Sequence, residues 1–194
     1  MAHLRDHIDL LRLRASRDPD AFARIYDRYV DAIYRFVSFK LPSKEDAQDV
    51  TADVFMKAWD HIRQDKPVEN VRAFLYQVAR NAVVDRYRRN HAESRGGQTT
   101  AVTFSLLEAS SVSEAVELGD EGRSADQVEA KAEVALLVRR LARLKDQYRD
   151  VLLLRLVDGL PFDAIASVMD VSAVNARVLY HRALKALRAS GISS

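Results

Sequence analysis

The 194-residue sequence predicts an all-α fold, with two small helical domains joined by a flexible acidic linker. Apolar residues recur at helical spacing over residues 20–91 and again over 127–190, and no alternating pattern indicates strands. Between these stretches, residues 92–126 are rich in Gly, Ser, Thr and acidic side chains, which is typical of a linker. The net charge follows the same division, with +3 for residues 1–95, −6 for 96–133 and +5 for 134–194.

These features set the expected boundaries. Residues 1–19 are an N-terminal extension, 20–91 a helical bundle, 92–126 the linker and 127–190 a domain with a helix-turn-helix. Pro42 and Pro67 interrupt the helical pattern of the first domain, which is therefore expected to contain three or four helices. The two basic blocks suggest a polyanionic partner, although solvated helix faces are often charged as well.

The first informative helix is expected over residues 43–62. At about 100° per residue, its apolar side chains share one side and four carboxylates share another, within an arc of about 60°. These carboxylates are Asp46, Asp49, Asp53 and Asp60, and only Lys57 lies among them. Such a stripe is either a solvated surface or a docking face for a basic partner. Carboxylate catalysis is not expected, because a surface stripe provides neither burial nor a pocket that would separate the pKa values.

The next helix is expected over residues 68–89, where arginines are dense and aromatic side chains lie between them. Aromatic rings beside arginines suit unpaired bases that stack next to a phosphate backbone. The alternative is that rings such as Phe74 and Tyr76 belong to the hydrophobic core and that the arginines are ordinary surface residues.

The C-terminal stretch predicts a helix-turn-helix, in which the second helix enters the major groove. A short helix within residues 160–169 is followed by a turn at Asp170 and Val171, and Ser172 is expected to cap a second helix over residues 173–188. One side of this second helix is expected to pack; it comprises Ala176, Leu179, Tyr180, Ala183 and Leu187. The opposite side is basic, with Arg177, His181, Lys185 and Arg188 beside Val174 and Val178, whose methyl groups suit contact with thymine. The alternative is an ordinary helical hairpin with a basic surface.

Composition excludes several classes of protein. The chain has no Cys, so it has no disulfide, thiolate metal site or cysteine nucleophile. The longest apolar run, residues 134–138, is too short to cross a bilayer. The charged N-terminus does not resemble a signal peptide. We therefore expect a soluble cytoplasmic protein that is not inserted in the membrane, with no catalytic residues, metal site or cofactor.

Three stretches carry a resemblance to a known family. They are EDAQDVTADVFMKAW (Glu45–Trp59), VRAFLYQVARNAVVDRYRR (Val71–Arg89), and RDVLLLRLVDGLPFDAIASVMDVS (Arg149–Ser172), which runs into ARVLYHRALKALR. In order, spacing and total length they resemble the bacterial RNA polymerase sigma factors of the extracytoplasmic-function (ECF) group. The resemblance implies a protein that is not an enzyme. It would bind the β and β′ subunits of core RNA polymerase, recognise the −35 and −10 promoter elements and help to open the DNA. An anti-sigma factor is a further implied partner.

The resemblance also implies which residues make these contacts. The polymerase clamp helices would meet Asp46, Asp49, Asp53 and Trp59, so that the acidic stripe is a docking face. The −10 element would be bound by Asn70, Arg72, Asn81, Asp85, Arg88 and Arg89, with a flipped base in the loop of residues 65–70. The −35 element would be bound by Ser172, Arg177, Val178, His181, Arg182 and Lys185. Carboxylates of the linker would imitate an RNA backbone in the RNA path of the polymerase.

Two residues depart from the family pattern. Leu179 replaces a frequent basic residue and is expected to join the packing face, while Ala52 replaces a frequent Gln on the side of its helix near the core.

Two other functions fit parts of the sequence. A stand-alone helix-turn-helix repressor would leave the acidic stripe unused and would normally be a symmetric dimer. A protein that acts only through protein partners would show no salt-sensitive affinity for DNA.

Overall fold

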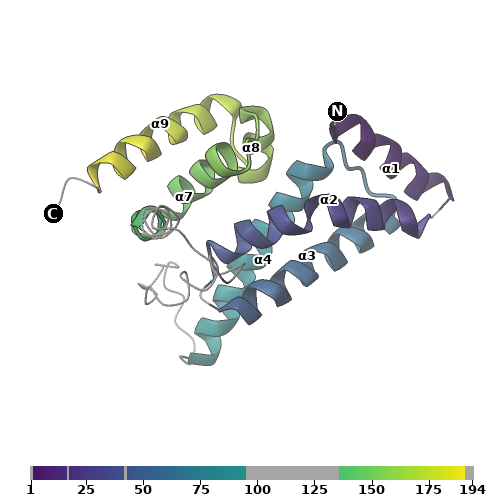
Figure 1. The fold of residues 1–194 in the computed structure, drawn as a ribbon, viewed down its shortest axis with the longest axis horizontal. Helices are drawn as coiled ribbons and strands as arrows, with labels where there is room; N and C mark the ends of the chain where they lie inside the picture. The colour runs from purple at the N-terminus through teal and green to yellow at the C-terminus, as the bar shows by residue number, and fades with distance from the viewer. Residues whose placement is uncertain (1, 17, 42, 95–135, 191–194) are drawn as a thin grey trace, which may run out of the picture. The chain divides into compact units, whose positions relative to one another are not determined.

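The computed structural model describes residues 2–16, 18–41, 43–94 and 136–190 (Figure 1). In this part of the chain every regular element is helical, so the all-α prediction is confirmed. The chain divides into two compact units. Most of the predicted linker, residues 95–126, and the first residues of the predicted second domain, 127–135, lie outside the described residues. No helix in the described part combines the length and apolar character that a membrane span requires.

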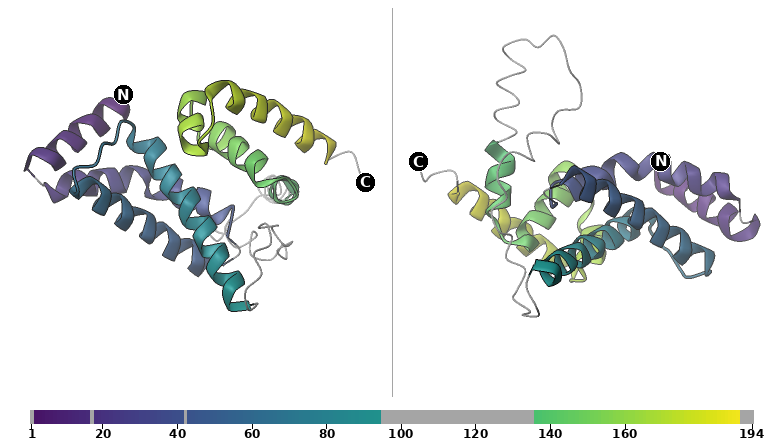
Figure 2. Two further views of the ribbon diagram at one scale, coloured as in Figure 1. Left: turned by 180° about the vertical axis from the view of Figure 1, so that it is seen from behind. Right: turned by 90° about the horizontal axis from the view of Figure 1, so that it is seen from below.

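The first unit consists of four helices, α1 (Ala2–Ser16), α2 (Pro19–Ser38), α3 (Lys44–Arg63) and α4 (Val71–Ser94) (Figure 2). Each of the last three buries apolar side chains at helical spacing, for example Ile25, Tyr29, Ile33 and Phe36 on α2. Burial of such a side chain contributes about 1.5–3 kcal/mol, so this periodicity is what holds the helices together. The rings of Phe36 and Tyr76 meet edge to face in this core, with centroids 5.3 Å apart.

The N-terminal extension forms α1, which an ion-pair network holds on α2. Asp6 and Asp9 are both buried, and they accept hydrogen bonds from Arg28, Arg24 and the Tyr29 hydroxyl. Burial by itself would raise the pKa of Asp9, but the hydrogen bonds from Arg28 and Arg24 outweigh it and hold that pKa below its ordinary value. Burial, followed by the hydrogen bond to Asp6, raises the pKa of Tyr29. The Asp9 carboxylate is therefore stabilised as an anion.

The end of α1 also contacts the segment that joins α3 to α4. Arg14 Nη2 donates a hydrogen bond of 2.9 Å to the carbonyl oxygen of Lys66. This segment runs beside α1 on its way to α4 (Figures 1 and 2). The extension is thus an ordered part of the first unit.

The second unit contains a helical stretch over residues 136–142, α7 (Asp146–Leu152), the π-helix η1 (Leu153–Val157), α8 (Phe162–Met169) and α9 (Ala173–Ala189). Gly159, with φ +66°, reverses the chain after η1, and this left-handed conformation favours glycine. The core is apolar and continuous across these elements; its fully buried members include Leu152, Leu153, Leu154, Leu160 and Ile165.

The predicted helix-turn-helix is confirmed. Helix α8 ends at Asp170, which adopts a left-handed conformation with φ 55°, and the Val171 N–H donates to the carbonyl oxygen of Ala166. Ser172 then caps α9, since its Oγ accepts a hydrogen bond of 3.1 Å from the Asn175 N–H. The turn therefore contains the αL residue and the N-cap that two successive helices require.

Candidate nucleic-acid interface

Helix α9 presents the basic face that the sequence predicts. Ala176, Leu179 and Ala183 are buried, which confirms that Leu179 belongs to the packing face, whereas Tyr180 and Leu187 are half-buried. The predicted −35 residues on this helix are exposed: Arg177, Val178, His181, Arg182 and Lys185. Ser172 is exposed as well, but its hydroxyl oxygen already accepts the capping hydrogen bond. The face combines cations with the exposed methyl groups of Val174 and Val178, which is the composition that direct readout of base edges uses.

Arg177 is oriented by an aromatic ring on the preceding helix. Its guanidinium carbon lies over the Phe162 ring, 5.6 Å from the centroid. Arg155 lies over the same ring at 4.7 Å and donates a hydrogen bond of 2.8 Å to the carbonyl oxygen of Leu160. Arg155 belongs to η1, whose wider turn is completed by the Asp158 N–H bonded to the Leu153 carbonyl oxygen. Arg155 of the π-helix, Phe162 of α8 and Arg177 of α9 thus form an Arg–Phe–Arg cluster beside α9.

Helix α4 gathers most of the predicted −10 residues on one exposed face. Asn81, Asp85, Arg88 and Arg89 are all exposed. Arg72 is not with them: it precedes Asn81 by nine residues, which is about 180° around the helix. It is half-buried, and its charge acts on Tyr29.

The remaining predicted −10 residue has a structural role at the start of α4. Asn70 Oδ1 accepts a hydrogen bond of 3.0 Å from the Ala73 N–H, so this side chain caps the helix. Of the two aromatic residues left open above, Tyr76 is wholly buried and is a core residue. Phe74 is half-buried against His61, with ring centroids 4.6 Å apart.

The acidic stripe of α3 lies beside α4 and is contacted by charged side chains of that helix. Arg86 Nη1 lies 3.5 Å from Asp46 Oδ1, and its Nη2 donates to Asp49 Oδ2 at 3.2 Å. Lys57 Nζ lies 4.0 Å from Asp85 Oδ2, a second contact between the two helices. The stripe is therefore partly neutralised by α4, and the contribution of Arg86 was missed from the sequence.

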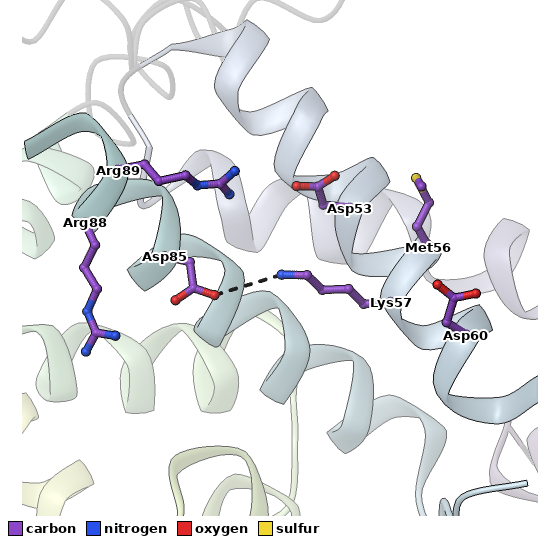
Figure 3. Close-up of a pocket in the computed structure, with 7 residues that line it drawn as sticks. All are labelled: Asp53, Met56, Lys57, Asp60, Asp85, Arg88 and Arg89. Atoms are coloured by element: carbon purple, nitrogen blue, oxygen red, sulfur yellow. Dashed lines mark ion pairs between the residues drawn. The ribbon is translucent and has the colours of Figure 1, made fainter. Parts of the chain in front are cut away.

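A hollow between α3 and α4 combines predicted polymerase-binding residues with predicted −10 residues. Figure 3 shows Lys57 extended from α3 toward Asp85 on α4. The lining residues are Asp53, Met56, Lys57, Asp60, Asp85, Arg88 and Arg89. Because both signs of charge border one open surface, a basic protein and a polyanion could bind side by side there.

Two further positions on α3 complete the account. Trp59 is half-buried and packs edge to face on Phe22, with centroids 4.9 Å apart, so only part of the indole is available to a partner. Ala52 is exposed, and the expectation that it lies near the core is wrong. The buried residues of α3, such as Val50 and Val54, centre about 120° from Ala52 around the helix.

The arginine and aromatic contacts that organise these faces carried only a weak signal in the sequence. Arg86 belongs to the arginine-rich stretch, but its pairing joins residues 37 and 40 positions apart. Phe162 and Arg177 are 15 residues apart, and the turn between α8 and α9 brings them together.

Known proteins resemble this chain over both units. The Sigma-70 region 2 family matches residues 25–93, and the Sigma-70, region 4 family matches residues 135–187. The ECF RNA polymerase sigma factor SigM of Bacillus subtilis is 31% identical over 165 residues, which cover 85% of this chain and 91% of SigM. The ECF RNA polymerase sigma factor BldN of Streptomyces coelicolor is 28% identical over 181 residues, which cover 93% of this chain but 64% of BldN.

A solved structure shares the fold. The sigma factor RpoE of Bartonella quintana, in a co-crystal structure with the anti-sigma factor NepR, superposes with a TM-score of 0.61 at 15% identity. The match covers 89% of this chain and 98% of that one.

Proposed function

This chain belongs to the ECF group of the sigma-70 family, and on that premise we propose that it binds core RNA polymerase and directs it to promoters through separate −10 and −35 contacts. The observation that carries the proposal is the exposed basic face of α9, which follows a helix-turn-helix turn and displays cations beside small apolar side chains. This is the arrangement with which a recognition helix reads the major groove.

The −35 contact is assigned to α9. Arg177 would form a bidentate contact with a base, and His181, Arg182 and Lys185 would meet neighbouring bases or phosphates. Val178 would contact a thymine methyl. Ser172 contributes by capping α9, and the N–H groups at that end favour a phosphate.

The −10 contact is assigned to the exposed face of α4. Asn81, Asp85, Arg88 and Arg89 would meet the DNA there, and the segment of residues 65–70 would receive an unpaired base. Asn70 and Arg72 would act indirectly. Asn70 caps the start of α4, and Arg72 lies on the half-buried side of the same helix.

Polymerase docking is assigned to α3. Asp49 and Asp53 would provide charge to the β′ clamp helices, Asp46 would act with Arg86 at the edge of the stripe, and the exposed part of Trp59 would add apolar contact. Such charge complementarity mainly increases the association rate and the specificity. We assign domain 2 of the family to residues 20–91, the linker to 92–126 and domain 4 to 127–190. The linker's carboxylates would follow the RNA path of the polymerase.

Regulation and location follow from the same surfaces. The residues proposed for polymerase docking are half-buried or exposed, so an anti-sigma factor could cover them. The sigma factor RpoE of similar fold is found in complex with the anti-sigma factor NepR. Since polymerase and promoter DNA are its targets, we place the protein in the cytoplasm.

The test is run-off transcription with purified core RNA polymerase on a library of genomic fragments, with and without the chain. Discrete start sites that depend on the chain are expected, preceded by a shared pair of promoter elements. If no new start site appeared while the chain alone bound specific DNA, a repressor would replace the proposal. If neither activity were found, a protein that acts only through protein partners would replace it.

A further inference from the structure

We propose that Phe162 is a positioning residue for −35 recognition, because it presents the Arg177 guanidinium to the DNA; the inference rests on the proposed −35 role of α9. The ring is carried by α8, outside the recognition helix, and none of the site residues predicted from the sequence lies on α8.

The first argument is geometric. Phe162 is the first residue of α8 and follows Pro161, whose backbone is extended with φ −69°, so the start of the helix fixes where the ring lies. The ring is only half-buried, whereas Ile165 of the same helix is wholly buried. It also meets Tyr180 of α9 edge to face, with centroids 5.6 Å apart. The ring therefore forms a small platform against one turn of α9.

The second argument is electrostatic. The face of an aromatic ring carries partial negative charge, and a guanidinium within about 6 Å of the centroid is attracted to it. Arg177 lies at 5.6 Å and Arg155 at 4.7 Å from the Phe162 centroid. Arg155 is already fixed by its hydrogen bond to the Leu160 carbonyl oxygen. Two cations near one ring repel each other, so Arg155 limits how far Arg177 can lie back over α8 and favours its extension toward the groove.

The third argument is entropic. An exposed arginine loses rotamer entropy when a base fixes it. The Phe162 ring restricts Arg177 before DNA arrives, so part of that loss has already occurred in the free protein. An exposed cation–π contact of this kind corresponds to about a two- to fivefold change in affinity. Loss of the contact between Phe162 and Arg177 should reduce discrimination between −35 sequences most at the base pair that Arg177 contacts.

The experiment measures binding of the full chain, assembled with core RNA polymerase, to a promoter and to a set with every single-base change in the −35 element. Phe162 is replaced by pentafluorophenylalanine, which keeps the ring's shape but reverses the charge on its face. Phe162→Leu and Phe162→Tyr are the companion variants. Each is made alone and with Arg177→Ala, and thermal unfolding is recorded for all of them.

Fluorination and Phe162→Leu should each weaken binding two- to fivefold and should lower discrimination at the same base pair as Arg177→Ala. Phe162→Tyr, which keeps the ring face, should bind as the parent does. In the Arg177→Ala background the Phe162 changes should have no further effect on promoter affinity, whereas with Lys185→Ala as the matched control their effects should multiply.

Two results would overturn the proposal, and they are distinguishable. If Arg177→Ala reduced −35 discrimination but the fluorinated ring did not, or if the two effects simply multiplied, Phe162 would be only a packing residue. If Arg177→Ala left discrimination unchanged, the −35 role of Arg177 would fail, and the proposed positioning would fail with it. The fluorinated variant retains the planar ring and is only slightly larger, so a folding defect in Phe162→Leu would not prevent the decision.

Discussion

Arg86→Ala is expected to destabilise the first unit, because this guanidinium joins α4 to the acidic stripe of α3. Arg86 lies 3.5 Å from Asp46 and 3.2 Å from Asp49. Its side chain is 21% exposed, that of Asp46 is 23% exposed and that of Asp49 is 70% exposed. The two ion pairs therefore differ in how strongly solvent screens them.

The magnitude follows from this difference. An exposed pair such as Arg86–Asp49 contributes about 0.2–1 kcal/mol. The Arg86–Asp46 pair is more shielded from water, and a hydrogen bond to a charged group in such surroundings contributes about 1.5–3 kcal/mol. Because the two pairs share one guanidinium and Asp46 has further interactions, the sum is an upper bound. We expect a loss of about 1–2 kcal/mol in the free energy of unfolding.

The assay is thermal unfolding of the full chain, monitored by circular dichroism. For a domain of 60–100 residues, about 1 kcal/mol lowers the midpoint by about 4–8 °C. Arg88→Ala is the matched control, since Arg88 is an exposed arginine on the same helix and its loss should stay within about 0.5 kcal/mol. A cycle with Asp46→Asn should show coupling between the two residues. If Arg86→Ala unfolded at the same temperature as Arg88→Ala, the ion pairs of Arg86 would contribute nothing to the stability of the first unit.

Three further predictions concern stability. The pKa of Asp9 is lowered in the folded protein, so the ionised carboxylate contributes fully to stability above its unfolded pKa of about 3.9. This contribution is lost as the pH falls through the folded pKa. The difference in stability between the parent and Asp9→Asn should therefore be smaller at pH 3 than at pH 7, as measured by urea unfolding. Ser172→Ala removes the N-cap of α9 and should cost about 1 kcal/mol in urea unfolding, while Ser172→Asn should retain most of it. Gly159→Ala should cost about 1–2 kcal/mol although an added Cβ would meet no atom within 4 Å, since φ +66° disfavours a Cβ; an unchanged unfolding midpoint would contradict this.

Much of the fold follows from local sequence. Periodic apolar residues, the breaks at Pro42 and Pro67, and the N-cap at Ser172 define the helices, because helical spacing and capping depend on residues within a few positions of one another. The basic face of α9 is equally local, since the rotation per residue alone separates Arg177 from Leu179.

Two assignments made from the sequence are not consistent with the rotation per residue of a helix. Ala52 was assigned to the side near the core, but the buried residues of α3 centre elsewhere and leave it exposed. Arg72 was grouped with Asn81, although the two residues lie on opposite sides of α4. Whether Tyr76 binds a base or fills the core could not be decided until its neighbour Phe36, 40 residues earlier, was in place.

The helical class, the helix-turn-helix, the charged faces and, through the order of three motifs, the resemblance to ECF sigma factors could thus be predicted from local sequence. Which charged side chains pair, and which aromatic rings orient them, became known from the packing of the helices. Arg86 meets Asp46 because α3 and α4 pack side by side, and Phe162 meets Arg177 because the αL residue Asp170 turns α9 back across α8. Such contacts depend on how helices pack, and helix packing is set by the sum of many apolar contacts that no short motif records.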